Sequence, residues 1–143
     1  METELNLSDS ELVVMRVIWS LGKASAEQIS QELDETYHWA ASTIKTFLAR
    51  LVKKELLITE KEGHKYIYSP TRSESDAITL MTTEFLRKIC ARKHKQVLLK
   101  ILEDSSFTEA DKVEVGIAIL KKETVAEVAC DCLDNMQYCS CED

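Results

Sequence analysis

The sequence lacks several features that would place it in other classes of protein. No uninterrupted apolar run approaches the ~20 residues that a membrane-spanning helix needs. There is no glycine-rich phosphate loop and no recognisable set of nucleophile, base and acid, so we do not expect an enzyme. The first residues, METELNLSDSE, are acidic and polar and do not resemble a secretion signal. We therefore expect a cytoplasmic protein without a membrane partner.

The composition is that of a folded protein with one domain, or one small domain with an appendage. The chain has 143 residues, of which 45% are hydrophobic. This length can bury a core without help from disulfide bonds or metal ions. No internal repeat and no low-complexity linker is visible in the sequence.

The net charge of −7 argues at first against nucleic-acid binding, but the charge is unevenly distributed. Residues 1–38 carry two basic and eight acidic side chains, residues 39–72 seven and three, and residues 73–143 nine and fourteen. The middle segment is therefore net +4 between segments of −6 and −5. A local basic segment is typical of nucleic-acid-binding surfaces, although many solvated helix faces have the same composition.

The first half of the sequence predicts three helices followed by a β-hairpin. Capping boxes at Ser8–Glu11 and Ser25–Gln28 begin the first two helices, and Gly22 ends the first. The third helix, which has a poorly capped start, and the two strands are expected at residues 41–54, 57–61 and 65–68. This order is that of a winged helix-turn-helix. We expect a mainly α fold with this domain over residues 1–72.

The second half is expected to be helical and to pair the chain with a second copy. Three apolar stripes indicate three short amphipathic helices. The stripes consist of Ala77, Ile78, Met81, Phe85 and Ile89, then Val97, Leu98, Ile101 and Leu102, then Val113, Ile117, Leu120 and Val125. Such helices seldom form a core alone, so a homodimer is the simplest solution, and packing onto the winged domain is the alternative. We expect a helical dimerisation domain over residues 73–128 and a tail over 129–143. Cys90 lies on the first stripe, beside Ile89, and is expected in the core.

Polar side chains on the third helix and in the hairpin turn are suited to contact DNA. Lysine and arginine bind phosphates or guanine edges, and serine and threonine bind phosphate oxygens or bases. The candidates are Ser42, Thr43, Lys45, Thr46, Arg50, Lys61, His64 and Lys65. Each of them also fits an ordinary solvated helix face or charged turn. Their combination with the helix order and the local positive charge favours DNA binding.

Three segments of the sequence resemble a known family of regulators. LSDSELVVMRVIWSLGKASAEQISQEL, WAASTIKTFLARLVKKELL and KEGHKYIYSP resemble the penicillinase-repressor family, which groups the BlaI, MecI and copper-responsive CopY repressors. The resemblance covers about residues 5–125. It is sharpest from Trp39 to Leu51 and from Gly63 to Tyr68.

The resemblance implies a dimeric winged-helix repressor that binds a palindromic DNA operator, with C-terminal helices pairing the subunits. It implies that the DNA is read by Thr43, Lys45, Thr46 and Arg50. Many relatives have serine where this chain has Ala40, so a phosphate contact at the start of the third helix is not carried over.

The end of the sequence contains four of the five cysteines, arranged as Cys130-x-Cys132 and Cys139-x-Cys141. In a reducing cytosol such a cluster indicates metal binding or redox activity rather than a structural disulfide. Residues i and i+2 of an extended chain face the same side, so each pair presents two thiolates together. Thiolates suit Zn(II) and Cu(I), and four of them can hold one zinc or two copper ions. A structural zinc clip and a regulatory dithiol pair are the alternatives.

Within the resembled family, the CopY group is the one marked by this cysteine arrangement. The resemblance therefore implies a repressor of copper-export genes that binds its operator when loaded with Zn(II) and leaves it when Cu(I) replaces zinc. A copper chaperone is a candidate metal donor. Four thiolates with one Zn(II) or with two Cu(I) carry the same charge of −2. Release of the operator would therefore depend on the different geometries of the two metal sites and not on their charge. Two alternatives are a β-lactam-responsive relative inactivated by proteolysis and a thiol-redox or copper-handling protein without a DNA role.

Overall fold

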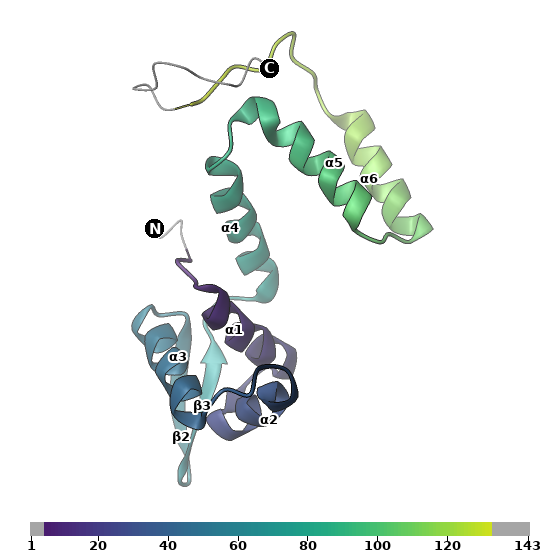
Figure 1. Ribbon diagram of the computed structural model, residues 1–143. Coiled ribbons are helices and arrows are strands. Elements are labelled where there is room, and N and C mark those ends of the chain that lie inside the picture. The colour runs from purple at the N-terminus through teal and green to yellow at the C-terminus, as the bar shows by residue number, and fades with distance from the viewer. Residues whose placement is uncertain (1–4, 133–143) are drawn as a thin grey trace. The chain divides into compact units, whose positions relative to one another are not determined.

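The computed structural model describes residues 5–132 and divides the chain into two compact units, residues 1–82 and 83–143. Helix α4 (Glu74–Arg87) begins in the first unit and ends in the second (Figure 1). Among the residues that the structure describes, no helix is long and apolar enough to cross a membrane.

The first unit contains three helices and a small antiparallel sheet. In chain order its elements are α1 (Asp9–Leu21), β1 (Ala24–Ser25), α2 (Ala26–Tyr37), α3 (Ala41–Lys53), β2 (Leu57–Glu62) and β3 (Lys65–Pro70). The sheet order is β1-β3-β2, and the β2–β3 hairpin reaches beyond the helices of this unit as a wing (Figure 1). This is the winged helix-turn-helix that the sequence predicts, with the two-residue strand β1 as an addition.

The starts and ends of the helices follow from local side-chain chemistry. Ser25 and Gln28 form the predicted capping box of α2, with Gln28 N–H donating to Ser25 Oγ at 3.2 Å and Ser25 N–H donating to Gln28 Oε1 at 2.9 Å. Gly22 ends α1 in a conformation with φ 83°, which favours glycine. Ala40 precedes α3 without a side-chain cap, as predicted.

Glu11 departs from the predicted capping box of α1. Ser8 Oγ accepts from the Glu11 N–H at 3.2 Å, which caps the helix as expected. The Glu11 carboxylate, however, accepts from Ser8 Oγ at 3.0 Å and forms an ion pair with Lys54 Nζ at 2.7 Å. Lys54 Nζ also donates to the backbone carbonyl of Asn6 at 2.7 Å. The buried Glu11 therefore joins the start of α1 to the end of α3.

The core of the first unit lies between its helices and the sheet. Its largest fully buried side chains are Met15, Ile18, Ile29, Ile44, Leu48, Leu51, Leu57 and Val14. Ala77 of α4 is also fully buried in this core. Trp19 Nε1 donates to the backbone carbonyl of Arg72 at 2.9 Å, which joins α1 to the segment between β3 and α4. Burial of these apolar side chains provides the main stabilisation of the winged unit.

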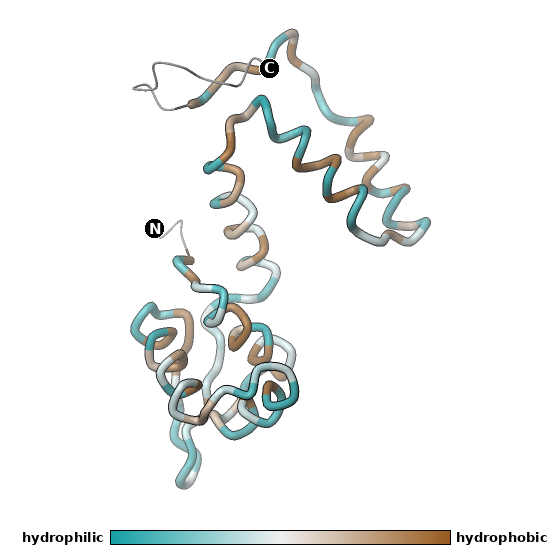
Figure 2. The backbone as a smooth tube through the Cα atoms, in the orientation of Figure 1, coloured by the Kyte–Doolittle hydropathy of each residue, from teal (hydrophilic) through white to brown (hydrophobic). Residues whose placement is uncertain are grey.

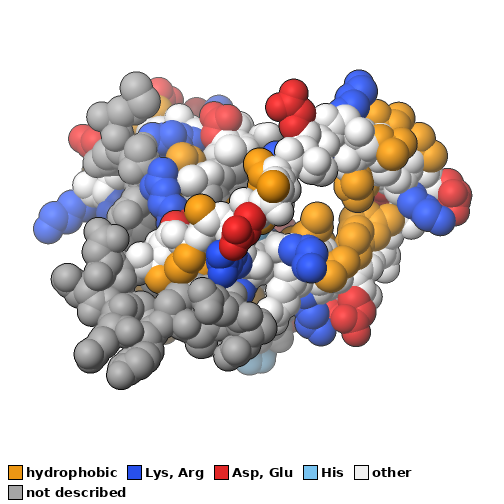
Figure 3. Space-filling view, turned by 90° about the horizontal axis from the view of Figure 1, so that it is seen from above, with side chains coloured by type: hydrophobic (Ala, Val, Ile, Leu, Met, Phe, Trp, Pro, Cys, Tyr) orange, Lys and Arg blue, Asp and Glu red, His pale blue; other side chains and the backbone are white. Residues whose placement is uncertain are grey.

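The second unit is helical and has no buried residue between residues 83 and 132. It contains the end of α4, the short 3-10 helix η1 (Ala91–Lys93), α5 (His94–Asp104) and α6 (Glu109–Lys121). Its exposed large hydrophobic side chains are Phe85, Leu98, Leu99, Ile101, Leu102, Phe107, Val113, Ile117, Ile119, Leu120, Val125 and Val128. Figure 2 shows apolar and polar positions alternating along α5 and α6, and Figure 3 shows hydrophobic side chains gathered over these helices. The predicted amphipathic helices form, but within one chain they leave much of their apolar surface in contact with solvent.

Candidate nucleic-acid interface and thiol cluster

Helix α3 has one buried face and one polar, exposed face. Ile44, Leu48 and Leu51 point into the core of the winged unit. Because a helix repeats every 3.6 residues, the remaining positions lie on the other side. The predicted DNA-reading residues on this side are Ser42, Lys45, Thr46 and Arg50, all exposed, and Thr43, which is half-buried. The sequence therefore places a row of hydroxyl and basic groups on the free surface of α3.

The basic side chains of this row are not neutralised by acidic neighbours. Within residues 5–132, no carboxylate forms an ion pair with Lys45 or Arg50. Thr46 Oγ1 donates to the Ser42 backbone carbonyl at 3.0 Å, which leaves its oxygen lone pairs able to accept. Two cationic groups and several hydroxyls can therefore meet an anionic ligand without first breaking a salt bridge.

Aromatic packing fixes the start of α3. The Trp39 ring lies 4.7 Å from the Tyr37 ring and 5.2 Å from the Phe47 ring, measured between centroids. Such pairs contribute about 0.5–1.5 kcal/mol beyond the burial of their surface. Trp39 thereby joins the end of α2 to the second turn of α3, at a helix start that has no side-chain cap.

The wing carries its predicted DNA-contacting residues at and near the turn. Gly63 has φ 62° and His64 follows it, so the turn between β2 and β3 lies at residues 63–64. Lys61, His64 and Lys65 are all exposed. Lys65 Nζ lies 3.0 Å from Glu27 Oε2 of α2, but both side chains are more than half exposed. A surface pair of this kind contributes only about 0–1 kcal/mol, so Lys65 can exchange it for a phosphate.

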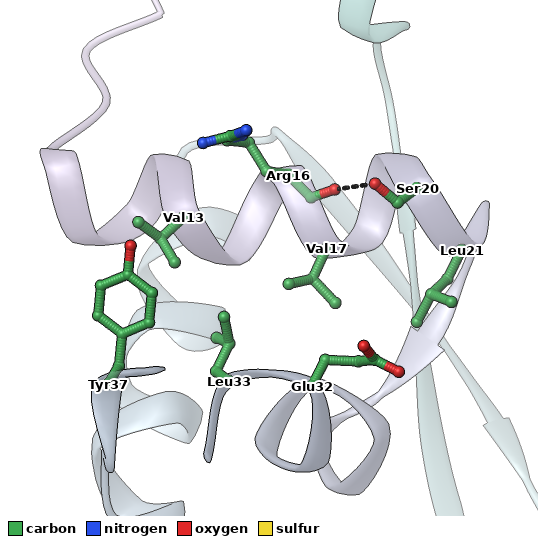
Figure 4. A pocket seen from close by; sticks show the side chains of 8 residues that line it. All are labelled: Val13, Arg16, Val17, Ser20, Leu21, Glu32, Leu33 and Tyr37. Atoms are coloured by element: carbon green, nitrogen blue, oxygen red, sulfur yellow. Dashed lines mark hydrogen bonds between the residues drawn. The ribbon is translucent and has the colours of Figure 1, made fainter. Parts of the chain in front are cut away.

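A shallow pocket between α1 and α2 is separate from the predicted site residues. It has a volume of about 270 Å³ and is lined by Val13, Arg16, Val17, Ser20, Leu21, Glu32, Leu33 and Tyr37 (Figure 4). Its walls are mainly apolar, and Arg16 and Glu32 are its charged residues. None of the predicted DNA-binding or metal-binding residues within residues 5–132 lines it.

Three cysteines of the second unit lie together. The sulfur atoms of Cys90, Cys130 and Cys132 are all within 4.8 Å of one another, and those of Cys90 and Cys130 are 3.8 Å apart. The first predicted Cys-x-Cys pair therefore has both thiols on one side, as expected. The second pair, Cys139 and Cys141, lies outside the described residues.

The prediction that Cys90 belongs to the core was wrong. Helix α4 ends at Arg87, and Cys90 lies in the turn before η1, where its side chain is half-buried. Its neighbours there include the thiols of Cys130 and Cys132. Sequence reasoning missed this position because the contact joins residues forty apart. The one feature of the sequence that could have indicated this position is the presence of a fifth cysteine outside the two Cys-x-Cys pairs.

Hydrogen bonds attach the segment around Cys130 to the turn that carries Cys90. Arg92 Nε donates to the Val128 carbonyl at 2.7 Å, and Arg92 Nη2 forms an ion pair with Glu127 at 2.9 Å. The Ala91 N–H donates to Asp131 Oδ1 at 2.8 Å. These contacts flank Cys130 on both sides. They hold the first cysteine pair beside Cys90.

The turn itself is fixed by His94. Its Nε2 lies 2.9 Å from the Leu86 carbonyl and 3.0 Å from the Ile89 carbonyl. Both partners are acceptors only, so Nε2 must carry a proton and donate to them. The His94 ring thus joins the Leu86 carbonyl, in the last turn of α4, to the Ile89 carbonyl, which follows the helix. His94 is therefore a structural residue of this turn.

The close thiols change one another's acidity. The Arg92 N–H donates to Cys90 and lowers its pKa, an effect that burial opposes in part. The hydrogen bond to Cys130, together with burial and the neighbouring sulfurs, raises the pKa of Cys132 to about 12. The Ala91 N–H lowers the pKa of Asp131. The first proton therefore leaves the cluster more easily than the next, because each additional thiolate is repelled by the first.

The donor set of this cluster fits a soft metal ion. A metal with bonds of ~2.3 Å to sulfur holds its sulfur ligands roughly 3.8–4.0 Å apart. The observed separation of 3.8 Å between Cys90 and Cys130 agrees with this spacing. Thiolates select Cu(I) and Zn(II) over hard cations such as Mg(II). A bound cation would also remove the mutual repulsion of the thiolates.

Comparison with known proteins identifies the family. A family model described as penicillinase repressor matches residues 7–121. The chain belongs to the penicillinase repressor family. Its relatives include an uncharacterised 16.5 kDa protein of Latilactobacillus sakei, which is 35% identical over 99% of this chain and 97% of its own length. A penicillinase repressor of Bacillus licheniformis is 35% identical over 71% of this chain and 80% of its own length. A solved CopR repressor structure is 51% identical, covers 48% of this chain and 99% of its own, and has a TM-score of 0.42.

The family assignment confirms the general predictions made from the sequence. The protein is a DNA-binding transcriptional repressor with a winged helix-turn-helix, and it is not an enzyme. The roles of individual residues of the repressor, its domain bounds and its response to Cu(I) or Zn(II) stay predictions.

Proposed function

We propose that this repressor is copper-responsive and controls copper-export genes. In this proposal a dimer loaded with Zn(II) binds a palindromic operator, and the operator is released when Cu(I) replaces zinc. The metal ligands are Cys130, Cys132, Cys139 and Cys141 of the two Cys-x-Cys pairs. The observation that carries the proposal is the cluster of thiols beside Cys130 in a member of a DNA-binding repressor family.

The exposed face of α3 and the wing support the DNA-binding part of the proposal. Helix α3 offers Lys45 and Arg50, which have no acidic partner among residues 5–132, and the wing adds Lys61 and His64 at its end. A helix fits the major groove, where arginine and lysine recognise guanine edges. We expect the wing to contact backbone phosphates, which carry no sequence information but fix the position of the protein.

The exposed apolar surface of the second unit supports a homodimer. No described residue after Thr82 is buried, although this part of the chain contains many large hydrophobic side chains. A water-exposed apolar surface of this extent marks an interaction site. A second copy of the chain offers the same surface with twofold symmetry, and a twofold dimer reads two half-sites about one helical turn of DNA apart, or a multiple of it.

The thiol cluster supports the metal response. In a cytoplasmic protein, close thiols that are not joined as a disulfide are suited to hold soft ions. A copper chaperone as the metal donor and the cytoplasmic location are part of the same proposal. Four thiolates with one Zn(II) or two Cu(I) have equal charge, so repulsion of DNA cannot distinguish the two states. The difference must lie in how the two metal states arrange the chain.

Replacing the four predicted ligands tests the proposal against the β-lactam-responsive alternative. We expect the variant with all four tail cysteines changed to serine to hold neither metal, so that added Zn(II) or Cu(I) no longer changes its operator affinity. The control is Ser106→Ala, an exposed position in the loop before α6, which leaves all the cysteines intact and is expected to keep the full response. If the four-serine variant still responds fully to copper, the proposed ligands are wrong. If it is regulated normally by β-lactams and proteolysis, the alternative function is correct.

A further inference from the structure

The two Cys-x-Cys pairs do not account for the fifth cysteine, Cys90. Its sulfur lies 3.8 Å from that of Cys130, and the three sulfurs of Cys90, Cys130 and Cys132 are within 4.8 Å of one another. Cys90 precedes the first pair by forty residues in the sequence. Its position beside the pair therefore results from the fold and not from a local motif.

We propose that Cys90 is a metal ligand and completes a three-thiolate Cu(I) site with Cys130 and Cys132. The inference rests on the proposed copper response and adds to it a ligand outside the tail. Cu(I) is a soft ion that accepts three sulfur ligands, whereas a structural Zn(II) site takes four. A cluster of three thiols therefore matches the smaller coordination number.

The surrounding contacts position the three sulfurs before a metal binds. Arg92 holds Glu127 and the Val128 carbonyl, and the Ala91 N–H holds Asp131. Cys90 directly precedes Ala91 and Arg92, and Cys130 lies between Val128 and Asp131. Each of the two chain segments that these hydrogen bonds join therefore carries at least one of the proposed ligands. A site that is ordered in advance binds its ion with less loss of conformational entropy.

The position of Cys90 also gives the metal a connection to α4. Cys90 lies three residues after the end of α4, and the same helix contributes Ala77 to the core of the winged unit. A metal held by Cys90 and Cys130 joins the tail to the end of this helix. A site made only by the tail would have no such bond. The cluster thus offers a covalent path through which the metal state can influence the DNA-binding unit.

The inference can be tested on the full chain with the second pair removed. We expect Cys139→Ser/Cys141→Ser to bind one Cu(I) per chain, with three sulfur neighbours in X-ray absorption spectroscopy under reducing conditions. Adding Cys90→Ser should reduce the sulfur count to two. It should also weaken Cu(I) affinity, measured by competition with a chromophoric chelator, by more than the roughly 10–100-fold that loss of an outer-shell partner costs.

Controls separate ligand loss from misfolding and from failure of the proposed function. Ser106→Ala in the same double variant changes an exposed residue of the loop before α6 and keeps all three thiols, so its Cu(I) affinity should be unchanged. Cys90→Ala should match Cys90→Ser, with an unchanged circular dichroism spectrum. Two sulfur neighbours in the double variant, or an affinity that Cys90→Ser does not change, would overturn the inference even if copper releases the operator. Three sulfur neighbours in the double variant, together with no release of the operator by copper in the unchanged chain, would uphold the inference and overturn the proposed function.

Discussion

Glu11 and Lys54 show how a single pair of charges joins two parts of the winged unit that are far apart in sequence. The Glu11 side chain is 4% exposed and that of Lys54 is 29% exposed, so the two partners differ in their access to water. A carboxylate left alone at a buried position keeps its full desolvation penalty. A lysine left alone at a partly exposed position can turn its ammonium group to solvent.

This asymmetry predicts different costs for removing each partner. We expect Lys54→Met to lower the free energy of unfolding by about 3 kcal/mol, because Glu11 stays buried without its cation. Glu11→Gln should cost only about 1–2 kcal/mol, because the amide can still accept from Ser8 and Lys54. Urea unfolding at neutral pH measures both. Equal costs for the two variants would contradict the asymmetric account.

Replacing the single residue Lys45 tests the predicted DNA interface. We expect Lys45→Ala to weaken binding to operator and to unrelated DNA alike if it contacts a phosphate. The slope of log affinity against log salt concentration should then fall by about 1. Fluorescence anisotropy at several salt concentrations measures this slope. Lys23→Ala removes the same charge between α1 and β1 and is the matched control, with an expected change in slope near zero.

The boundaries of the helices are the part of the fold that the sequence predicts best. Helix α3 was expected over residues 41–54 and is observed at Ala41–Lys53, because its apolar positions repeat at helical spacing. The hairpin was expected with strands ending at residues 61 and 68, and both strands are slightly longer. Strand β1 has only two residues and pairs with β3, so no local pattern could indicate it.

The misjudged residues are those whose surroundings come from distant segments. Glu11 is buried by its ion pair with Lys54, which lies 43 residues away. Cys90 lies in the thiol cluster because Arg92 and Ala91 hold residues 127–131. Periodicity and capping motifs report on contacts within one element. They carry no information on such pairings, so both residues were assigned from their neighbours in sequence.

Helix α3 begins without a side-chain cap, so adding one should stabilise the helix. Ala40 has the extended backbone conformation of an N-cap, with φ −63° and ψ 150°, but no side-chain acceptor. Serine at this position can accept from the Thr43 N–H, so we expect Ala40→Ser to raise the free energy of unfolding by about 1 kcal/mol. Chemical unfolding measures the change. Ala41→Ser places the hydroxyl one residue later and should give no comparable gain.

The second unit of a single chain leaves the apolar faces of its helices uncovered. Between residues 83 and 132 no side chain is buried, yet α5 and α6 carry apolar stripes along their length. A helix gains most of its stability in a protein from packing of its apolar face. The sequence predicts the helices but not the partner surface. We therefore expect the dimer to complete the folding of this unit.

A charge placed in the apolar stripe of α6 should dissociate the dimer. Ile117 is 46% exposed in the single chain, and we expect Ile117→Asp to weaken dimerisation. In a twofold dimer the change occurs twice, and each buried isoleucine contributes about 1.5–3 kcal/mol, so the loss should be roughly 100-fold or more. Sedimentation equilibrium measures the dissociation constant. As a control, Ser106→Asp adds the same charge in the loop before α6 and should leave the dimer intact. If Ser106→Asp dissociates the dimer as strongly as Ile117→Asp, general charge repulsion is responsible and the α6 stripe is not the interface.

In the proposed function, Cu(I) and operator DNA bind different conformations of the whole repressor, so each weakens the binding of the other. By linkage, copper can weaken operator binding only by the factor by which it prefers the DNA-free form, which for such couplings is typically ~5–150-fold. Titration of Cu(I) into the complex of the zinc-loaded repressor with its operator, followed by fluorescence anisotropy under reducing conditions, measures this factor directly. We predict release of the operator with a loss of affinity in this range. Unchanged operator affinity at two Cu(I) per chain would contradict the account.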